Sequence, residues 1–313
     1  MICTKDRPQE LELSCLAANA ASPGLPILVI DASSSTETEA LCARLVTERE
    51  ARLRLIYRRA SRSGLTRQRN EGIDICHDLG AEIVHFIDDD TIVSAGYFRE
   101  IESRFARDPD VMGLGGVIVN QPALSHVTLK RFFLLASRRR GRVLPSGRNV
   151  LGQYPGSPAA DHVDWLSGCS MSYRASVLSQ MRFDARRDGV ALGEDYDFGF
   201  RVSRTHRLAV EPAAQCVHHV TPTARSSSRA TVREGLLTTY GWVRENRERG
   251  MSPLAFWWAT GGELALHGLK LLVRRDARSC QELLGLLDAL GAIARNQTSS
   301  TQSRHTHDRA PSI

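Results

Sequence analysis

Paired cysteines are missing from this sequence. The 313 residues include seven cysteines, and no two of them form a C-x-x-C motif. An odd number of widely spaced cysteines argues against a zinc site or a dithiol redox centre. The chain does not open on a charged segment followed by an apolar one, so no secretory signal is evident. We therefore expect reduced thiols and a cytoplasmic protein.

A long apolar run without charges is also missing. The nearest candidate, residues 253–273, contains Glu263 and Lys270. A charged side chain near the bilayer centre costs roughly 2.5–3.5 kcal/mol on insertion scales, which disfavours a membrane span. Trp257 and Trp258 near one end, with basic residues at the other, suit a helix in the lipid headgroup region. The alternatives are peripheral contact with the inner face of the cell membrane and packing of this helix against the protein itself.

The composition is that of a globular protein. Hydrophobic residues make up 42% of the chain and charged residues 24%. The net charge of +6 permits attraction to phosphates or anionic lipid, but the arginines are spread over most of the sequence. We therefore expect no nucleic-acid partner.

Short apolar runs alternate with longer amphipathic stretches from residue 1 to about 120. This alternation predicts βαβ units, and hence an α/β fold with a mostly parallel central sheet flanked by helices. Residues 120–160 form a basic stretch with glycine and proline that predicts a mobile loop. The predicted strands are residues 25–30, 53–57 and 83–87, and the predicted helices lie near 36–49, 65–79, 95–107, 174–181 and 231–247.

The most informative motif is the acidic triplet Asp88, Asp89 and Asp90, which follows the apolar residues 81–87. A strand continuing through it would project Asp88 and Asp90 to one side and Asp89 to the other. Converging carboxylates repel unless a cation such as Mn²⁺ or Mg²⁺ lies between them. The alternative is an acidic turn at a strand end. Asp31 also follows a predicted strand, so both acidic features fall where ligands bind in parallel sheets.

A second acidic cluster, Glu194 and Asp195, follows Gly193 and precedes an amphipathic stretch. Glycine predicts a turn, and acids at a helix N-terminus interact favourably with the helix dipole, so capping alone explains them. The functional interpretation is that one carboxylate acts as a general base toward an acceptor hydroxyl.

Two weaker signals complete the candidate site. Arg67 and Asn70 lie in a loop that enters a predicted helix, where a diphosphate could bind; a solvent-facing arginine is the alternative. His218 and His219 end an apolar run, and only one of two adjacent strand residues can face a metal.

Taken together, these signals form an ordered pattern. In chain order, the motifs are residues 2–8, residues 29–31, Arg67 with Asn70, residues 86–90, residues 168–171, Glu194 with Asp195, and His219. Over about residues 1–245 this pattern resembles family 2 inverting glycosyltransferases of the GT-A fold. The length of the chain leaves room for a C-terminal helical extension after this region.

The resemblance implies a nucleotide-sugar donor site. Its residues would be Thr4 and Arg7 beside the nucleotide base, Asp31 bonded to the base, Arg67 and Asn70 at the diphosphate, Asp88 and Asp89 beside the ribose or metal, and Asp90 with His219 on the Mn²⁺ or Mg²⁺ ion. His219 matches the family better than His218, because Pro222 follows it at a familiar distance.

The resemblance also implies the chemistry. Asp195 would be the base that deprotonates an acceptor hydroxyl, with Glu194 supporting the acceptor site. The reaction would be a single in-line displacement that inverts the anomeric carbon. The candidate interfacial helix over residues 253–273 suggests a glycan or lipid-linked acceptor, in polysaccharide or glycolipid synthesis of the cell envelope. The alternatives are a nucleotidyltransferase, although Gly24 is the only glycine in residues 1–30 and no Gly-rich phosphate loop follows the first strand, and an inactive sugar-binding protein.

The domain boundaries follow from the same pattern. We expect a GT-A domain over residues 1–222, a helical extension over 223–295 that is a candidate for membrane-surface contact, and a disordered tail over 296–313. Family members usually have several apolar residues before residues 2–4, whereas here the first strand would begin at Met1. A shortened central strand loses ladder hydrogen bonds, so added upstream residues are expected to raise the melting temperature.

Overall fold

The structure is a computed structural model that describes residues 1–48, 53–121, 127–156, 160–187, 193–219 and 228–296. The chain divides into two compact units. The α/β unit comprises Met1–Ser125, Arg138–Val143 and Val150–Thr221. The helical unit comprises His126–Ser137, Leu144–Asn149 and Pro222–Ile313.

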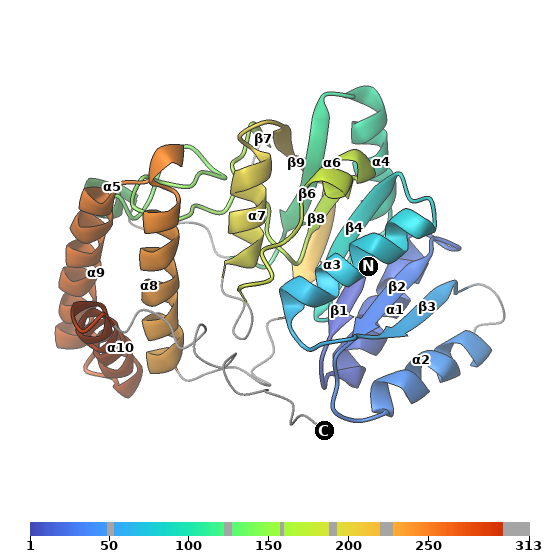
Figure 1. Ribbon diagram of the computed structural model, residues 1–313, viewed down its shortest axis with the longest axis horizontal. Helices are drawn as coiled ribbons and strands as arrows, with labels where there is room; N and C mark the ends of the chain where they lie inside the picture. Colours follow the sequence, from blue (N-terminus) through green and yellow to red (C-terminus); the bar gives the residue numbers. More distant parts are fainter. Residues whose placement is uncertain (49–52, 122–126, 157–159, 188–192, 220–227, 297–313) are drawn as a thin grey trace, which may run out of the picture. The chain divides into compact units, whose positions relative to one another are not determined.

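The α/β unit is built on one mixed sheet of strand order β3-β2-β1-β4-β8-β6-β9-β5, with β7 paired to β9 (Figure 1). Strands β3, β2, β1 and β4 run parallel, and β8 turns the sheet antiparallel at β4. The strands are β1 (Ile2–Thr4), β2 (Ile27–Asp31), β3 (Leu55–Arg59), β4 (Ile83–Asp88), β5 (Thr91–Val93), β6 (Val111–Ile118), β7 (Ala160–Asp161), β8 (Met171–Arg174) and β9 (Arg207–His218).

The helices of this unit follow the strands in the predicted alternation. They are α1 (Pro8–Ala21), α2 (Glu37–Glu48), α3 (Leu65–Asp78), α4 (Tyr97–Arg107), α6 (Ala175–Gln180) and α7 (Glu194–Val202). The α/β fold class, the parallel pairing of the first strands and the helices over 36–49, 65–79 and 95–107 are thereby confirmed to within about two residues.

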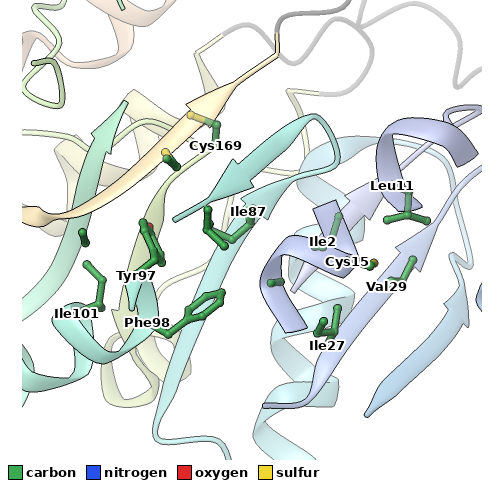
Figure 2. Packing of buried hydrophobic residues seen from close by; sticks show 14 of the residues in the cluster. Ile2, Leu11, Cys15, Ile27, Val29, Ile87, Tyr97, Phe98, Ile101 and Cys169 are labelled. Carbon is green, nitrogen blue, oxygen red and sulfur yellow. The ribbon is translucent and has the colours of Figure 1, made fainter. Parts of the chain in front are cut away.

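Alternate side chains of the strands enter two separate cores, one on each face of the sheet. Ile27 and Val29 of β2 pack with Leu11 of α1 on one face (Figure 2). Leu28 and Ile30 of the same strand pack on the other face, in the core that includes residues of α3, α6 and α7. Because both faces are covered, the strand reads as a continuous apolar run in the sequence.

The helical unit contains α5 (Val127–Phe132), α8 (Ser228–Glu245), the short helix η1 (Arg247–Arg249), α9 (Pro253–Arg274) and α10 (Ala277–Ala294). α10 packs against both α8 and α9. A Cβ on Gly262 of α9 would lie 2.2 Å from the ring of Phe133, so this glycine admits the segment after α5. Among the described residues, no helix is long and apolar enough to cross a bilayer.

The structure differs from the sequence prediction in the middle of the chain. Residues 120–160, predicted to be one loop, contain α5 and contribute two segments to the helical unit. The predicted boundary at residue 222 and almost all of the predicted tail lie outside the described residues, so both stay predictions.

Candidate functional site

The acidic triplet lies at the turn from β4 into β5. β4 ends at Asp88, and β5 pairs antiparallel with the end of β9, with Thr91 opposite His218. This pairing brings His218 Nε2 to 2.9 Å from Asp90 Oδ1. Ligand atoms of Asp88, Asp90 and His218 all lie within 4.8 Å of one another. The predicted convergence of Asp88 and Asp90 therefore occurs, although the strand itself ends at Asp88.

The donor set of this cluster fits a divalent cation. Carboxylate oxygens suit Mg²⁺ and Mn²⁺, and an imidazole nitrogen is acceptable to Mn²⁺. Burial lowers the pKa of His218, but hydrogen bonds with Asp90 and Cys169 outweigh it and raise the pKa to about 10. An ion that binds here must therefore displace a proton from the imidazole.

His218, rather than the predicted His219, is the histidine that approaches the acidic cluster. His219 contributes its backbone, whose N–H donates to the carbonyl oxygen of Asp90 at 2.8 Å. The Asn120 side-chain amide donates to the carbonyl oxygen of His218 at 2.8 Å and accepts from the His218 N–H at 3.1 Å. β9 ends at His218, and the ring of this residue is the one that reaches the two carboxylates.

Asp89 points toward the N-terminal segment. Thr4 Oγ1 donates to Asp89 Oδ2 at 2.7 Å, and Arg7 Nη1 donates to Asp89 Oδ1 at 3.1 Å and to Asp90 Oδ2 at 3.3 Å. Burial raises the pKa of Asp89 to about 6, while Thr4 and Arg7 oppose that rise. The structure thus places Thr4 and Arg7 against the triplet, where they hold its carboxylates.

Asp31 ends β2 beside Thr4 of β1 and is fully buried. Its carboxylate accepts hydrogen bonds from the Ser33 N–H at 2.8 Å and the Tyr57 hydroxyl at 2.9 Å. Arg59 lies 3.6 Å from the same carboxylate. Groups of the protein therefore already form hydrogen bonds with the carboxylate of Asp31, the residue predicted to bind the nucleotide base.

The second acidic cluster begins α7, as predicted. Gly193 precedes it with a φ of 83°, a left-handed conformation that glycine adopts without strain. Asp195 accepts hydrogen bonds from the Gly168 N–H at 3.0 Å and from the Tyr196 N–H at 2.8 Å. Burial raises the pKa of Asp195, and burial together with the neighbouring Asp195 raises the pKa of Glu194 to about 8.

Arg69 joins the two acidic clusters. This buried guanidinium donates to Glu194 Oε1 at 2.9 Å and to Asp88 Oδ1 at 3.3 Å. A Cβ on Gly168 would lie 2.7 Å from Arg69 Nη2, so a side chain there would make the guanidinium shift. One cation thus ties the end of β4 to the start of α7.

Sequence reasoning chose Arg67 and Asn70 and missed Arg69 between them. Arg69 shares the buried face of α3 with Gly72, Ile73 and Cys76, at the spacing i, i+3, i+4 and i+7. That spacing was the signal for an arginine that enters the protein.

The two predicted residues of α3 have different surroundings. The Asn70 amide both donates to and accepts from the backbone of Phe183, at 2.9 Å each. Arg67 is half-buried and lies two residues, or about 200° around the helix, from Arg69. Through its amide, Asn70 therefore anchors the segment before α7.

Known proteins share the sequence profile and the fold of this chain. Residues 1–237 match the profile of a family described as glycosyltransferase like family 2. No curated protein sequence matches the chain.

Several solved structures share the fold. The mannosyltransferase PcManGT from Pyrobaculum calidifontis, in complex with GDP-Man and Mn²⁺, has 17% sequence identity and a TM-score of 0.52, over 94% of this chain and 74% of that chain. S. aureus TarS 1-349 in complex with UDP-GlcNAc has 11% identity and a TM-score of 0.51, over 94% and 90%. GalNAc-T7 with UDP, GalNAc and Mn²⁺ has 14% identity and a TM-score of 0.50, over 74% and 47%. These likenesses show a common GT-A fold.

Proposed function

Because the chain belongs to glycosyltransferase like family 2 and is therefore a glycosyltransferase, we propose that it moves a sugar from a nucleoside diphosphate sugar to a hydroxyl acceptor with inversion of the anomeric carbon. One observation carries this proposal. Arg69 holds Asp88 of the candidate metal cluster and Glu194 at the start of α7 on a single guanidinium. The candidate base Asp195 is thereby kept next to the residues that would bind the donor.

Asp195 is the proposed general base. Its backbone hydrogen bonds with Gly168 and Tyr196 fix the orientation of the carboxylate. Burial raises its pKa above the ordinary value, which makes the ionised carboxylate a stronger proton acceptor. Asp195 would take the proton of the acceptor hydroxyl as that oxygen bonds to the anomeric carbon and the nucleoside diphosphate departs.

Asp88, Asp90 and His218 are the proposed metal ligands. A divalent cation held by them would offset the negative charge that develops on the departing diphosphate. Arg7 stabilises the ionised form of Asp90 through its hydrogen bond to Oδ2. Thr4 and Arg7 keep Asp89 directed away from the cluster, so Asp88 and Asp90 remain the two carboxylates that face it.

Donor and acceptor follow from the fold relatives and the chemistry. We propose a GDP- or UDP-linked sugar, because GDP-Man and UDP-GlcNAc accompany the structures with this fold. We further propose a glycan or lipid-linked hydroxyl as acceptor and work at the cytoplasmic side of a membrane, where nucleotide sugars are available.

The test is release of nucleoside diphosphate from a panel of GDP- and UDP-sugars, with and without Mn²⁺ or Mg²⁺. We expect turnover that needs the cation. Asp195→Asn should lower kcat about 10²- to 10⁴-fold, the usual contribution of a general base. The matched control is Asp78→Asn, because this aspartate is exposed at the end of α3.

Two results would contradict the proposal. The first is turnover by a folded Asp195→Asn variant at the rate of the parent, which would remove Asp195 as the base. The second is product with retained configuration at the anomeric carbon, determined by proton NMR, which would remove the single displacement.

A further inference from the structure

Helix α9 presents an apolar stripe to solvent. Its exposed positions 254, 258, 261, 265, 269 and 272 average 3.6 residues apart and therefore lie on one face of the helix. The side chains at these positions are Leu254, Trp258, Gly261, Ala265, Leu269 and Leu272. The stripe extends over nearly the whole helix, which at 22 residues is about 33 Å long.

This exposure is unusual for the chain. Of the 13 large hydrophobic side chains that are exposed among the described residues, six belong to α9. Leu254 is 84% exposed, Leu272 72% and Val273 75%. Phe132 of α5 is 63% exposed and packs edge-on against Trp258, so it widens the apolar surface at that end. Contiguous exposed apolar surface marks an interaction site more often than scattered residues do.

Three exposed cations flank the stripe, and Asp276 is the acidic neighbour of one of them, Arg274. Exposed Lys130 lies on α5, and exposed Arg274 and Arg275 end α9. The only acidic residue of α9, Glu263, is ion-paired with Arg148 at 2.6 Å. The stripe together with these three cations is called the α9 face below.

A hollow of about 880 Å³ lies between α5 and α9. Its lining includes Leu129, Leu266 and Leu269 together with Lys130 and Arg274. The hollow thus combines apolar side chains with three cationic ones, Lys130, Lys270 and Arg274, and one acidic one, Glu263.

We propose that the α9 face docks on the surface of an anionic phospholipid bilayer, with the stripe buried at the boundary of headgroups and acyl chains. The apolar side chains match the acyl boundary, and the excess of cations over acids matches anionic headgroups. Trp257 and Trp258 occupy the headgroup level, where tryptophan is enriched. A second copy of the chain is a poorer partner, because its own α9 face would bring the same excess of cations to the interface.

The experiment is floatation of the full chain with vesicles of phosphatidylcholine containing phosphatidylglycerol, compared with phosphatidylcholine alone. We expect the chain to float with the anionic vesicles, with less binding at high salt. The emission of Trp257 and Trp258 should shift to the blue on binding, since Trp165 and Trp242 are already buried.

Paired variants separate the two parts of the α9 face. The double variant Leu269→Glu, Leu272→Glu should lower the partition coefficient more than tenfold, and glutamate preserves the helix. Its matched control is Leu13→Glu, Leu79→Glu, which replaces two exposed leucines of the α/β unit. Lys130→Gln and Arg274→Gln should each weaken binding to anionic vesicles about fivefold and leave binding to neutral vesicles unchanged.

Three outcomes would overturn the proposal. The folded parent chain could fail to float with anionic vesicles. The leucine-to-glutamate variant of the stripe could float as well as its control. Light scattering could show a dimer that only the stripe variant disrupts while no variant binds vesicles, which would assign the face to a second copy of the chain.

Discussion

Asp195 and Glu194 are adjacent carboxyls at the start of α7, and the fold disfavours their ionised forms. Burial is the largest cause for both, and the negative charge of Asp195 adds to the rise of the Glu194 pKa. Arg69 opposes the rise but does not cancel it. The pair therefore exchanges protons with solvent at higher pH than free carboxyls do.

This rise predicts the acid limb of the pH profile. Asp195 must be ionised to accept a proton, so kcat/KM should fall as pH drops through its raised pKa, above the usual value of about 3.9. The pKa of Glu194, raised to about 8, keeps this carboxyl protonated and uncharged over the acid range, so Glu194→Gln should leave the acid limb where it is. The measurement is the pH dependence of kcat/KM for the parent and the variant. An acid limb at the ordinary aspartate pKa, or a limb that moves to lower pH in the variant, would contradict this assignment.

At the residue scale, the sequence predicted which segments form the candidate site better than which side chains of those segments meet there. It identified the triplet and the acids of α7, which follow directly from short motifs. It preferred His219 to His218, because the choice depends on the register of β5 against β9, which is a pairing between distant segments. It missed Arg69 for a related reason: the partner Glu194 is 125 residues away.

At the scale of elements, the site depends on how closely α7 approaches the segment before β8. A Cβ on Gly199 of α7 would lie 2.7 Å from the Cα of Trp165 and 3.3 Å from the backbone nitrogen of Leu166. Backbone atoms cannot move aside as a flexible side chain can. Gly199 therefore sets the distance between α7 and the turn that holds Gly168.

Gly199→Ala tests this contact. Forcing α7 outward should lower the free energy of unfolding by about 1–3 kcal/mol and reduce kcat, because Asp195 moves with the helix. Gly235→Ala on α8 is the matched control, since nothing lies within 4 Å of the added Cβ. It should stabilise by about 0.5–1 kcal/mol and leave kcat unchanged. Urea unfolding and turnover assays measure both variants. If the two changed the free energy of unfolding and kcat equally, the close approach of α7 would limit neither quantity.

Helices and strands were predictable where the spacing of apolar residues within one segment reveals the type of element. Strands β2, β3 and β4 and helices α2, α3 and α4 were predicted within about two residues. The α5 segment was predicted as loop, since its apolar residues Leu129 and Phe132 are exposed on a helix of only six residues. Mid-chain residues join the helical unit through contacts with segments far along the chain. The spacing of apolar residues within one segment cannot predict such contacts.

At the scale of the whole molecule, the two units divide the proposed tasks. All the residues proposed for donor binding and base catalysis belong to the α/β unit, and the α9 face belongs to the helical unit. Cation binding should therefore stabilise the α/β unit without stabilising the helical unit, whereas vesicle binding should involve the helical unit.

Calorimetry with and without Mn²⁺ tests this division. A ligand at 100 times its Kd stabilises the state that binds it by about 2.7 kcal/mol. For a unit of this size, that corresponds to a rise in Tm of about 5–10 °C. We expect Mn²⁺ with a nucleoside diphosphate to raise the transition temperature of the α/β unit by such an amount, and EDTA to reverse the rise.

Asp90→Asn should abolish the rise in Tm, whereas Asp78→Asn should retain it. The shift is the quantity to compare, because Asp90→Asn also removes the ion pairs with Arg7 and His218 and so lowers the starting Tm. An equal shift in both variants would place the cation away from Asp90.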